Sequence, residues 1–373
     1  MEIDPCFISL HEKLSLLFDS ALKKSIFPGA AVGVITGSKS ERKKYIMTFG
    51  NRAVTPEVKQ LDQGVFFDLA SLTKPLATTL AVLSLIKEKK IRLDDRLDDL
   101  LEKEVASKKK KITLFHLLNH CSGLPAHRLF YKELINFPKD KRQDILFSRI
   151  LAEPLEYETG SKAVYSDLGF MLLGRMIEIK SLKKLDQYVE NRILAPLGLE
   201  KDLFFNPLEE KKEKKYAATE DCPWRQKILC GEVHDQNCYA VGGLSGQAGL
   251  FGTINGVLNL VSMLHDINQG WARHSSFRKE NLNFFFRKQN MVSDSSWGLG
   301  FDTPSKKGSS GGRFISDKSV GHLGFTGTSF WIDPLRQLVM VLLTNRIHPH
   351  IKEGIKTFRP LFHDAVIKSL YSG

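Results

Sequence analysis

Ser71 and Lys74 are the residues whose types and spacing most directly suggest chemistry. They follow a short β-prone run and begin a predicted helix, in which positions i and i+3 lie on one face. A serine hydroxyl is a poor nucleophile without a base, and a lysine amine whose pKa is lowered can take its proton. The N–H groups at a helix start also favour developing negative charge. Because this spacing often occurs by chance, other motifs must support a catalytic role.

A second candidate group is Tyr165-Ser166-Asp167, directly before a predicted helix. A tyrosine at such a boundary can project its phenol into a cleft, where a lysine ammonium can lower its pKa enough for proton transfer. The carboxylate of Asp167 can orient Lys74. The alternative is a structural one, a buried tyrosine beside an acid that caps a helix.

The glycine-rich residues 321–328 form a third group. Glycines within a strand mark the close approach of a ligand or another backbone. Such a strand can offer an N–H to an oxyanion, together with the N–H of the nucleophile. His322 adds a donor or a proton carrier near neutral pH. The alternative is a glycine-rich edge strand.

Apolar spacing predicts the elements that must position these groups. Helices are expected over residues 9–25, 71–90, 141–152, 168–180, 182–194, 257–267 and 351–370, with Thr113 capping another that ends near His120; strands are expected over 30–35, 44–50, 296–301, 322–332 and 338–344. Strands near both ends predict an α/β fold in which one sheet is built from both termini. Residues 1–70 and 290–373 would form this lobe, and residues 71–289 a mostly helical lobe, with the active site between them.

Composition and charge narrow the possible partners. Of the 373 residues, 42% are hydrophobic and 26% charged, which is ordinary for a globular protein. The absence of a long apolar run or a leader-like start predicts a cytoplasmic protein without membrane contact. The net charge of +12 lies partly in short basic runs typical of solvated loops, without the interleaved aromatic residues that indicate nucleic-acid binding. A positive field favours anionic small-molecule substrates.

Five cysteines are spread along the chain, which favours reduced thiols over a disulfide framework. Cys222, Cys230, His234 and Cys238 are close enough in sequence to raise the question of zinc. Their spacing contains no C-x-x-C pair, however, so we predict three reduced cysteines in a loop-rich segment and no metal.

Together, Ser71-x-x-Lys74, Tyr165-x-Asp167 and His322-x-Gly324 resemble the motifs of the serine β-lactamase and penicillin-binding-protein superfamily. The resemblance covers about residues 25–346 and is closest to the class C β-lactamase-like branch of esterases, D-aminopeptidases and amidases. It is supported by residues 28–32, 112–125 and 331–334. It implies a two-lobed fold with an antiparallel sheet and a serine hydrolase that forms an acyl-enzyme without a cofactor.

The same resemblance implies roles for the motif residues. Ser71 would be the acylated nucleophile, and Lys74 its base or its electrostatic partner. Tyr165 would be the base that also serves the leaving group, with Asp167 in the polar third position of its motif. The N–H groups of Ser71 and Phe325 would form the oxyanion hole.

Two departures from the family pattern bear on substrate choice. Many members have Asn where this chain has Asp167, and Lys-Thr-Gly where it has His322-Leu323-Gly324. The lysine and threonine of that motif help hold a substrate carboxylate. Their replacement weakens this carboxylate site and argues against efficient β-lactam hydrolysis. Gly324 and Thr326 remain as residues expected to contact the substrate.

A finer resemblance concerns residues 218–221, 231–235 and 242–252. They look like a bacterial subgroup linked to cell-wall recycling, which includes N-acetylmuramoyl-L-alanine amidases. His234 would then lie near the cleft, or else anchor a loop. The alternatives are a carboxylesterase, a weak β-lactamase, or a non-catalytic protein that binds wall fragments. The sequence does not decide the oligomeric state.

Overall fold

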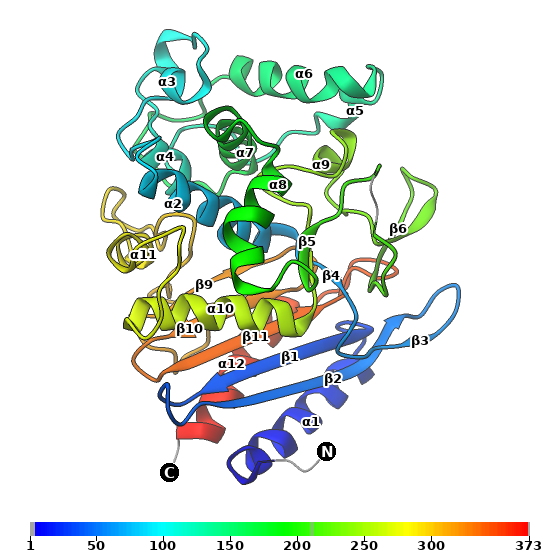
Figure 1. The fold of residues 1–373 in the computed structure, drawn as a ribbon. Coiled ribbons are helices and arrows are strands. Elements are labelled where there is room, and N and C mark those ends of the chain that lie inside the picture. Colours follow the sequence, from blue (N-terminus) through cyan, green and yellow to red (C-terminus); the bar gives the residue numbers. More distant parts are fainter. Residues whose placement is uncertain (1–3, 210–211, 372–373) are drawn as a thin grey trace.

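A six-stranded antiparallel sheet forms the base of the computed structural model, which describes residues 4–209 and 212–371 (Figure 1). The strand order is β3-β2-β1-β11-β10-β9. These strands are β1 (Gly29–Thr36), β2 (Lys43–Ala53), β3 (Lys59–Gln60), β9 (Val320–Leu323), β10 (Ser329–Asp333) and β11 (Leu338–Thr344). Ala30 lies opposite Thr344, so strands from the two ends of the chain are neighbours at the centre of the sheet. This confirms the sheet predicted from both termini.

Helices cover both faces of this sheet (Figure 1). The helices α1 (Ile8–Lys23) and α12 (Ile355–Tyr371) share one apolar cluster with Val32 and Val34 of β1. The helix α10 (Ile254–Gln269) packs on the opposite face, against β1 and β11. Since alternate side chains of a strand point to opposite faces, β1 is apolar throughout and buried on both sides.

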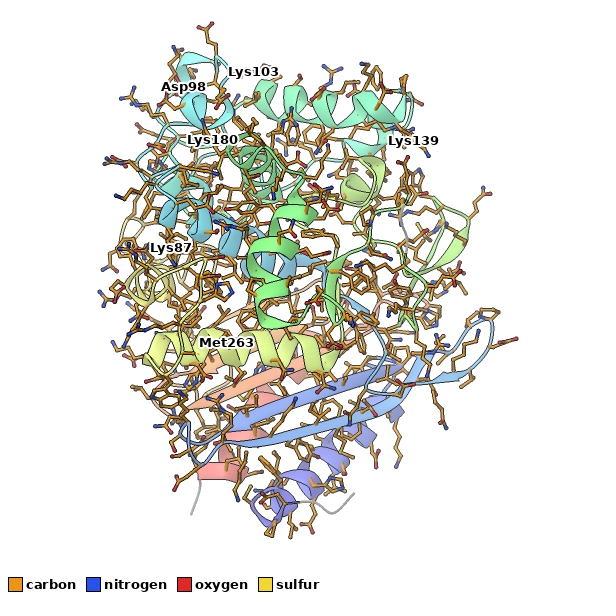
Figure 2. All side chains as sticks on the ribbon, in the orientation of Figure 1. Lys87, Asp98, Lys103, Lys139, Lys180 and Met263 are labelled. Atoms are coloured by element: carbon orange, nitrogen blue, oxygen red, sulfur yellow. The ribbon has the colours of Figure 1, made fainter. Side chains whose placement is uncertain are left out.

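A mostly helical region stands on the α10 side of the sheet. It contains α2 (Leu80–Lys87), α3 (Leu97–Leu101), α4 (Leu114–Leu118), α5 (Tyr131–Leu134), α6 (Lys139–Ala152), α7 (Asp167–Ser181), α8 (Leu185–Val189), α9 (Gln236–Ala240) and α11 (Lys279–Phe286). Small sheets add β4 (Phe67–Asp68), β8 (Leu250–Gly252) and β5 (Leu203–Phe205), and β6 (Ala218–Cys222) with β7 (Lys227–Cys230). Charged side chains such as Lys103 and Lys139 point outward from its rim (Figure 2). No helix among the described residues is long and apolar enough to span a membrane.

Two of the predicted strands are wrong. Residues 322–332 form a hairpin instead of one strand, because a turn over residues 324–328 separates β9 from β10. The Gly324 N–H donates to the Thr328 carbonyl across this turn (2.8 Å). Residues 296–301 form no strand, and only an isolated bridge joins Trp297 to Asp302. The glycine-rich motif therefore offers its backbone groups from a turn.

The helix predicted from Ser71 has three parts. A 3-10 turn covers Ala70–Leu72, a π-helical segment covers Lys74–Thr79, and α2 follows. π-Helical segments are rare and often lie at functional sites. The predicted boundaries between the lobes, near residues 70 and 290, remain a prediction.

Candidate active site

Ser71 lies in the 3-10 turn between β4 and the π-helical segment that begins at Lys74. The preceding Ala70 has φ of 47°, a left-handed conformation that is uncommon for a residue with a Cβ. The buried Asp68 stabilises this turn, since its Oδ1 accepts the Ala70 N–H (2.8 Å) and its Oδ2 accepts the His234 N–H (2.7 Å). Burial raises the pKa of Asp68. The sequence analysis missed this residue, although an aspartate just before a helix is a capping signal.

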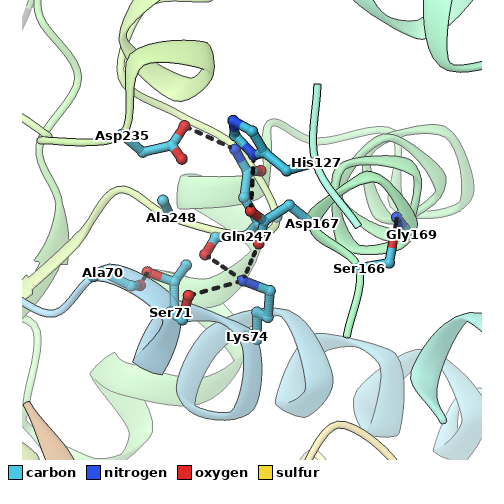
Figure 3. Close-up of polar contacts among 12 residues, drawn as sticks. Ala70, Ser71, Lys74, His127, Ser166, Asp167, Gly169, Asp235, Gln247 and Ala248 are labelled. Atoms are coloured by element: carbon cyan, nitrogen blue, oxygen red, sulfur yellow. Dashed lines mark hydrogen bonds and ion pairs between the residues drawn. The ribbon is translucent and has the colours of Figure 1, made fainter. Parts of the chain in front are cut away.

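Lys74 is fully buried beside Ser71 (Figure 3). Its Nζ donates to Ser71 Oγ (3.0 Å) and to the Gln247 carbonyl (3.2 Å). Burial alone would lower the pKa of Lys74, but the negative charge of Asp167 outweighs this effect and raises it above the ordinary value. Lys74 is therefore an ammonium in the resting structure. The lowered pKa that Lys74 would need to act as the base is therefore not found, and the geometry favours its alternative role as an electrostatic partner.

Asp167 is the acidic partner of Lys74. Its Oδ1 lies 2.8 Å from Lys74 Nζ, and its Oδ2 lies 3.2 Å from His127 Nδ1 (Figure 3). Burial raises the pKa of Asp167, but Lys74 and His127 lower it by more. The pKa therefore lies below its ordinary value, and the carboxyl group is ionised. Asp167 is the first residue of α7, directly after its N-cap Ser166. His127 is a further residue that the sequence analysis missed, because no motif links it to a residue forty positions away.

Tyr165 lies against the same lysine. Lys74 Nζ is 4.8 Å from the centre of its ring, and Trp297 stacks on that ring at 5.5 Å. Burial raises the pKa of Tyr165 more than Lys74 and Ser71 lower it, so the predicted fall in pKa is wrong. The hydroxyl forms no hydrogen bond of normal geometry within the described part of the chain. It is therefore a neutral phenol next to a charged lysine.

His322 lies on the other side of Tyr165, with 6.0 Å between the ring centres. Its Nδ1 donates to the Leu323 carbonyl (2.8 Å), since a carbonyl can only accept. Burial, and then the charge of Lys74, lower the pKa of His322 to about 3. The imidazole is thus neutral near pH 7, so of the two roles expected for His322, donor or proton carrier, the structure favours the donor. Its Nε2 has no partner among the described residues.

The turn between β9 and β10 is bound to the segment before Ser71. Thr326 Oγ1 donates to the Asp68 carbonyl (2.8 Å), and Thr328 Oγ1 donates to the Leu69 carbonyl (3.3 Å). Gly324 is closely packed, because a Cβ there would lie 2.7 Å from the Leu69 carbonyl oxygen. The Phe325 N–H forms no hydrogen bond with any described residue. It is thus a free donor close to the nucleophile.

A cavity of about 880 Å³ connects these groups. Its lining includes Ser71, Tyr165, Asp167, His322, Gly324, Phe325 and His234. The His234 ring stacks on the Phe325 ring at 5.4 Å, and its Nε2 lies 3.2 Å from Glu220 Oε2. All the predicted site residues except Lys74 and Thr326 therefore line one cavity. Lys74 and Thr326 are buried next to the lining, where Lys74 contacts Ser71 and Thr326 contacts Asp68.

The remaining candidate ligands are the cysteines near His234 in the sequence. Cys222 and Cys238 are buried thiols, and the Cys230 Sγ lies 3.8 Å from the Tyr216 carbonyl oxygen. No group of three or more His, Cys, Asp or Glu side chains in residues 4–209 and 212–371 is arranged to hold a metal ion.

Comparison with known proteins agrees with this fold. The Beta-lactamase family model matches residues 15–359, so the chain belongs to the β-lactamase family and is a serine hydrolase of that family. The chain is 31% identical to the N-acetylmuramyl-L-alanine amidase of Bacillus subtilis, over 92% of this chain and 85% of the relative. It is 32% identical to a putative D-alanyl-D-alanine carboxypeptidase of Escherichia coli, over 79% and 72%.

Solved structures show the same fold at lower identity. The octameric penicillin-binding protein homologue from Pyrococcus abyssi has a TM-score of 0.73 at 20% identity, covering 95% of this chain and 77% of that one. EstCE1, a hydrolase with promiscuous acyltransferase activity, has a TM-score of 0.74 at 20% identity, covering 96% and 98%. These likenesses confirm the β-lactamase-like fold.

Proposed function

We propose that the chain is an amidase that splits the bond between N-acetylmuramic acid and L-alanine through an acyl-enzyme on Ser71. The observation that carries this proposal is the contact of Ser71 Oγ with the charged Lys74 at the wall of the cavity. The substrate class is supported by the similarity to the amidase of Bacillus subtilis. The cavity volume fits a small-molecule substrate.

In the proposed reaction Ser71 Oγ attacks the amide carbonyl carbon, and its proton must leave. Lys74 and Tyr165 are both protonated at rest. The pair must therefore lose one proton before it can accept that of Ser71, so acylation should become faster as pH rises. The same pair returns the proton to the leaving amine. Water then hydrolyses the acyl-enzyme and restores Ser71.

The N–H groups of Ser71 and Phe325 are the proposed oxyanion donors. The free Phe325 N–H and the hydrogen bonds from the turn to Asp68 and Leu69 support this assignment. Such donors typically contribute about 2.7–4 kcal/mol of transition-state stabilisation each.

A second candidate is a D-alanyl-D-alanine carboxypeptidase, favoured by the similarity to the protein of that name from Escherichia coli. The same residues would also serve an esterase or a weak β-lactamase. A non-catalytic binder of wall fragments is less consistent with the charged Lys74 placed on Ser71. We also propose a cytoplasmic location, in which reduced cysteines such as the buried Cys222 and Cys238 are usual.

Intact-mass spectrometry with a fluorophosphonate probe tests the nucleophile, with the Ser71→Ala variant as control. We expect one adduct on the wild-type protein and none on a folded Ser71→Ala variant. Hydrolysis of N-acetylmuramoyl-L-alanine, a D-alanyl-D-alanine peptide and a short acyl ester then ranks the substrates. An unlabelled wild-type protein, or equal turnover by Ser71→Ala, would overturn the acyl-enzyme mechanism.

A further inference from the structure

Two arginines line the part of the cavity next to α12. Arg359 of α12 is only 6% exposed, yet no carboxylate of the described residues pairs with it. Its Nη2 donates to the carbonyls of Gly324 (2.6 Å) and Thr328 (2.8 Å), and its Nε has no partner in the described part of the chain. A buried charge without a counter-charge is costly, so this arginine requires an explanation.

Arg346, which follows β11, is the more accessible of the two. It is half-buried, and it donates from Nε to the Phe325 carbonyl (2.9 Å) and from Nη1 to the Lys352 carbonyl (3.2 Å). Its guanidinium lies 5.0 Å from the centre of the Phe325 ring. Glu353 is exposed and close enough to affect its pKa, but forms no ion pair with it.

The two guanidinium groups act on each other as like charges. Burial, and then the charge of the neighbouring Arg346, lower the pKa of Arg359 to about 9. Arg346 and Arg359 bond only to neutral main-chain oxygens, and both line the cavity. Guanidinium groups bind carboxylates in preference to such oxygens, because the ionic hydrogen bond is stronger. Glu353 also lines this end of the cavity, but no described carboxylate forms an ion pair with either arginine.

We propose that Arg346 and Arg359 form a subsite for a carboxylate of the substrate. The inference rests on the proposed function, in which that group is the free carboxylate of the L-alanine leaving group. Arg346 presents its guanidinium to the carboxylate, and Arg359 contributes charge from behind the turn. The subsite thereby supplies the positive charge that His322-Leu323 lacks.

The subsite is also linked to the proposed oxyanion hole. Arg346 holds the carbonyl of Phe325, while Arg359 holds the two ends of the same turn at Gly324 and Thr328. A carboxylate that orders Arg346 would therefore also hold the Phe325 N–H in place. Such a link favours substrates that carry the anionic group.

The test compares two substrates that differ only at this carboxylate, N-acetylmuramoyl-L-alanine and N-acetylmuramoyl-L-alaninamide. We expect the wild-type protein to prefer the free acid by about tenfold or more in kcat/KM, and Arg346→Met to lose the preference mainly through KM. Arg346→Lys should retain part of it. Arg273→Met is the matched control, because Arg273 is exposed and has no hydrogen bond or ion pair with the described residues. Equal losses on both substrates would overturn the subsite.

A second measurement separates the subsite from the choice of substrate. N-acetyl-L-alanine should slow the fluorophosphonate labelling of Ser71, whereas N-acetyl-L-alaninamide should have little effect at the same concentration. Arg346→Met should abolish this difference. If the acid protects Ser71 while neither muramoyl compound is hydrolysed, the subsite stands and the proposed substrate is wrong. If the acid and the amide act alike on the wild-type protein, the subsite is wrong.

Discussion

The two ends of the cavity differ in whether their buried cations form ion pairs. Next to Ser71, the buried Lys74 lies 2.8 Å from Asp167, which also contacts His127. Next to α12, the hydrogen bonds that Arg346 and Arg359 donate to the described residues all go to main-chain oxygens. A paired charge fixes the protonation state of its partner, which suits groups that move protons. An unpaired charge leaves a positive potential, which suits the binding of an anion.

Removing the cation of the paired end should have the largest effect. Lys74→Met is expected to lower turnover and the rate of fluorophosphonate labelling by about 10²–10⁴-fold, the usual range for a group that assists proton transfer. It also leaves the Asp167 carboxylate with His127 alone. Circular dichroism of the folded variant is the control. Labelling at the wild-type rate would show that the paired end does not activate Ser71.

Neutralising the acid of the paired end should change the pH dependence of the rate. Since Asp167 raises the pKa of Lys74 and burial lowers it, Asp167→Asn lets burial dominate. The Lys74–Tyr165 pair then loses its proton at lower pH. The increase in rate with rising pH should therefore begin at a lower pH in the variant than in the wild-type protein. We expect the variant-to-wild-type rate ratio to fall about tenfold between pH 6 and pH 9.

The control for this experiment is Asp144→Asn, since Asp144 is 70% exposed on α6. It should leave the ratio constant over the same range. If Asp167→Asn behaves like this control, the ion pair does not set the protonation state of Lys74. A uniform loss of rate at every pH would point to a structural role.

The smallest effect is expected from Asp302 in the cavity wall, which forms no ion pair with the described residues. Burial raises the pKa of Asp302 to about 6, so the folded state holds a proton that the unfolded state releases above about pH 4. Stability should therefore fall as pH rises from about 4 to 6. Asp302→Asn should be more stable than the wild type at pH 7.5 by about 1–3 kcal/mol, with little difference at pH 4.

Denaturant unfolding at both pH values measures this difference. Asp317→Asn is the matched control, since Asp317 is 80% exposed and should give the same stability as the wild type at both. An Asp302→Asn variant with no gain at pH 7.5 would show that the Ser296 and Thr303 hydrogen bonds offset the cost of the buried charge.

Much of the sheet could be predicted from the sequence, because β1, β2 and β11 are apolar or alternating runs with clear ends. The spacing of Ser71 and Lys74 likewise placed two reacting groups on one helical turn. The break between β9 and β10 was missed, since apolar residues lie on both sides of the glycines and periodicity does not show a turn. The local sequence pattern thus predicts strands and helices better than the turns that interrupt them.

The protonation states of the site could not be predicted from the motifs. They depend on burial and on neighbours from distant segments, such as His127 beside Asp167 and Trp297 beside Tyr165. Arg359 carried no signal either, because a lone arginine in a helix usually faces solvent. Its importance follows only from its burial and the missing carboxylate.

The pairing of β1 with β11 also affects how the protein is made. Gly33 and Val341 are neighbours in the sheet but are synthesised about 300 residues apart. At roughly 5–20 residues per second, β1 waits on the order of 15–60 seconds for its partner strand to leave the ribosome. Until then its apolar edge is open to other strands, a recognised aggregation risk. The order of synthesis thus leaves this edge of β1 exposed for longer than the edge that pairs with β2, which follows it directly in the chain.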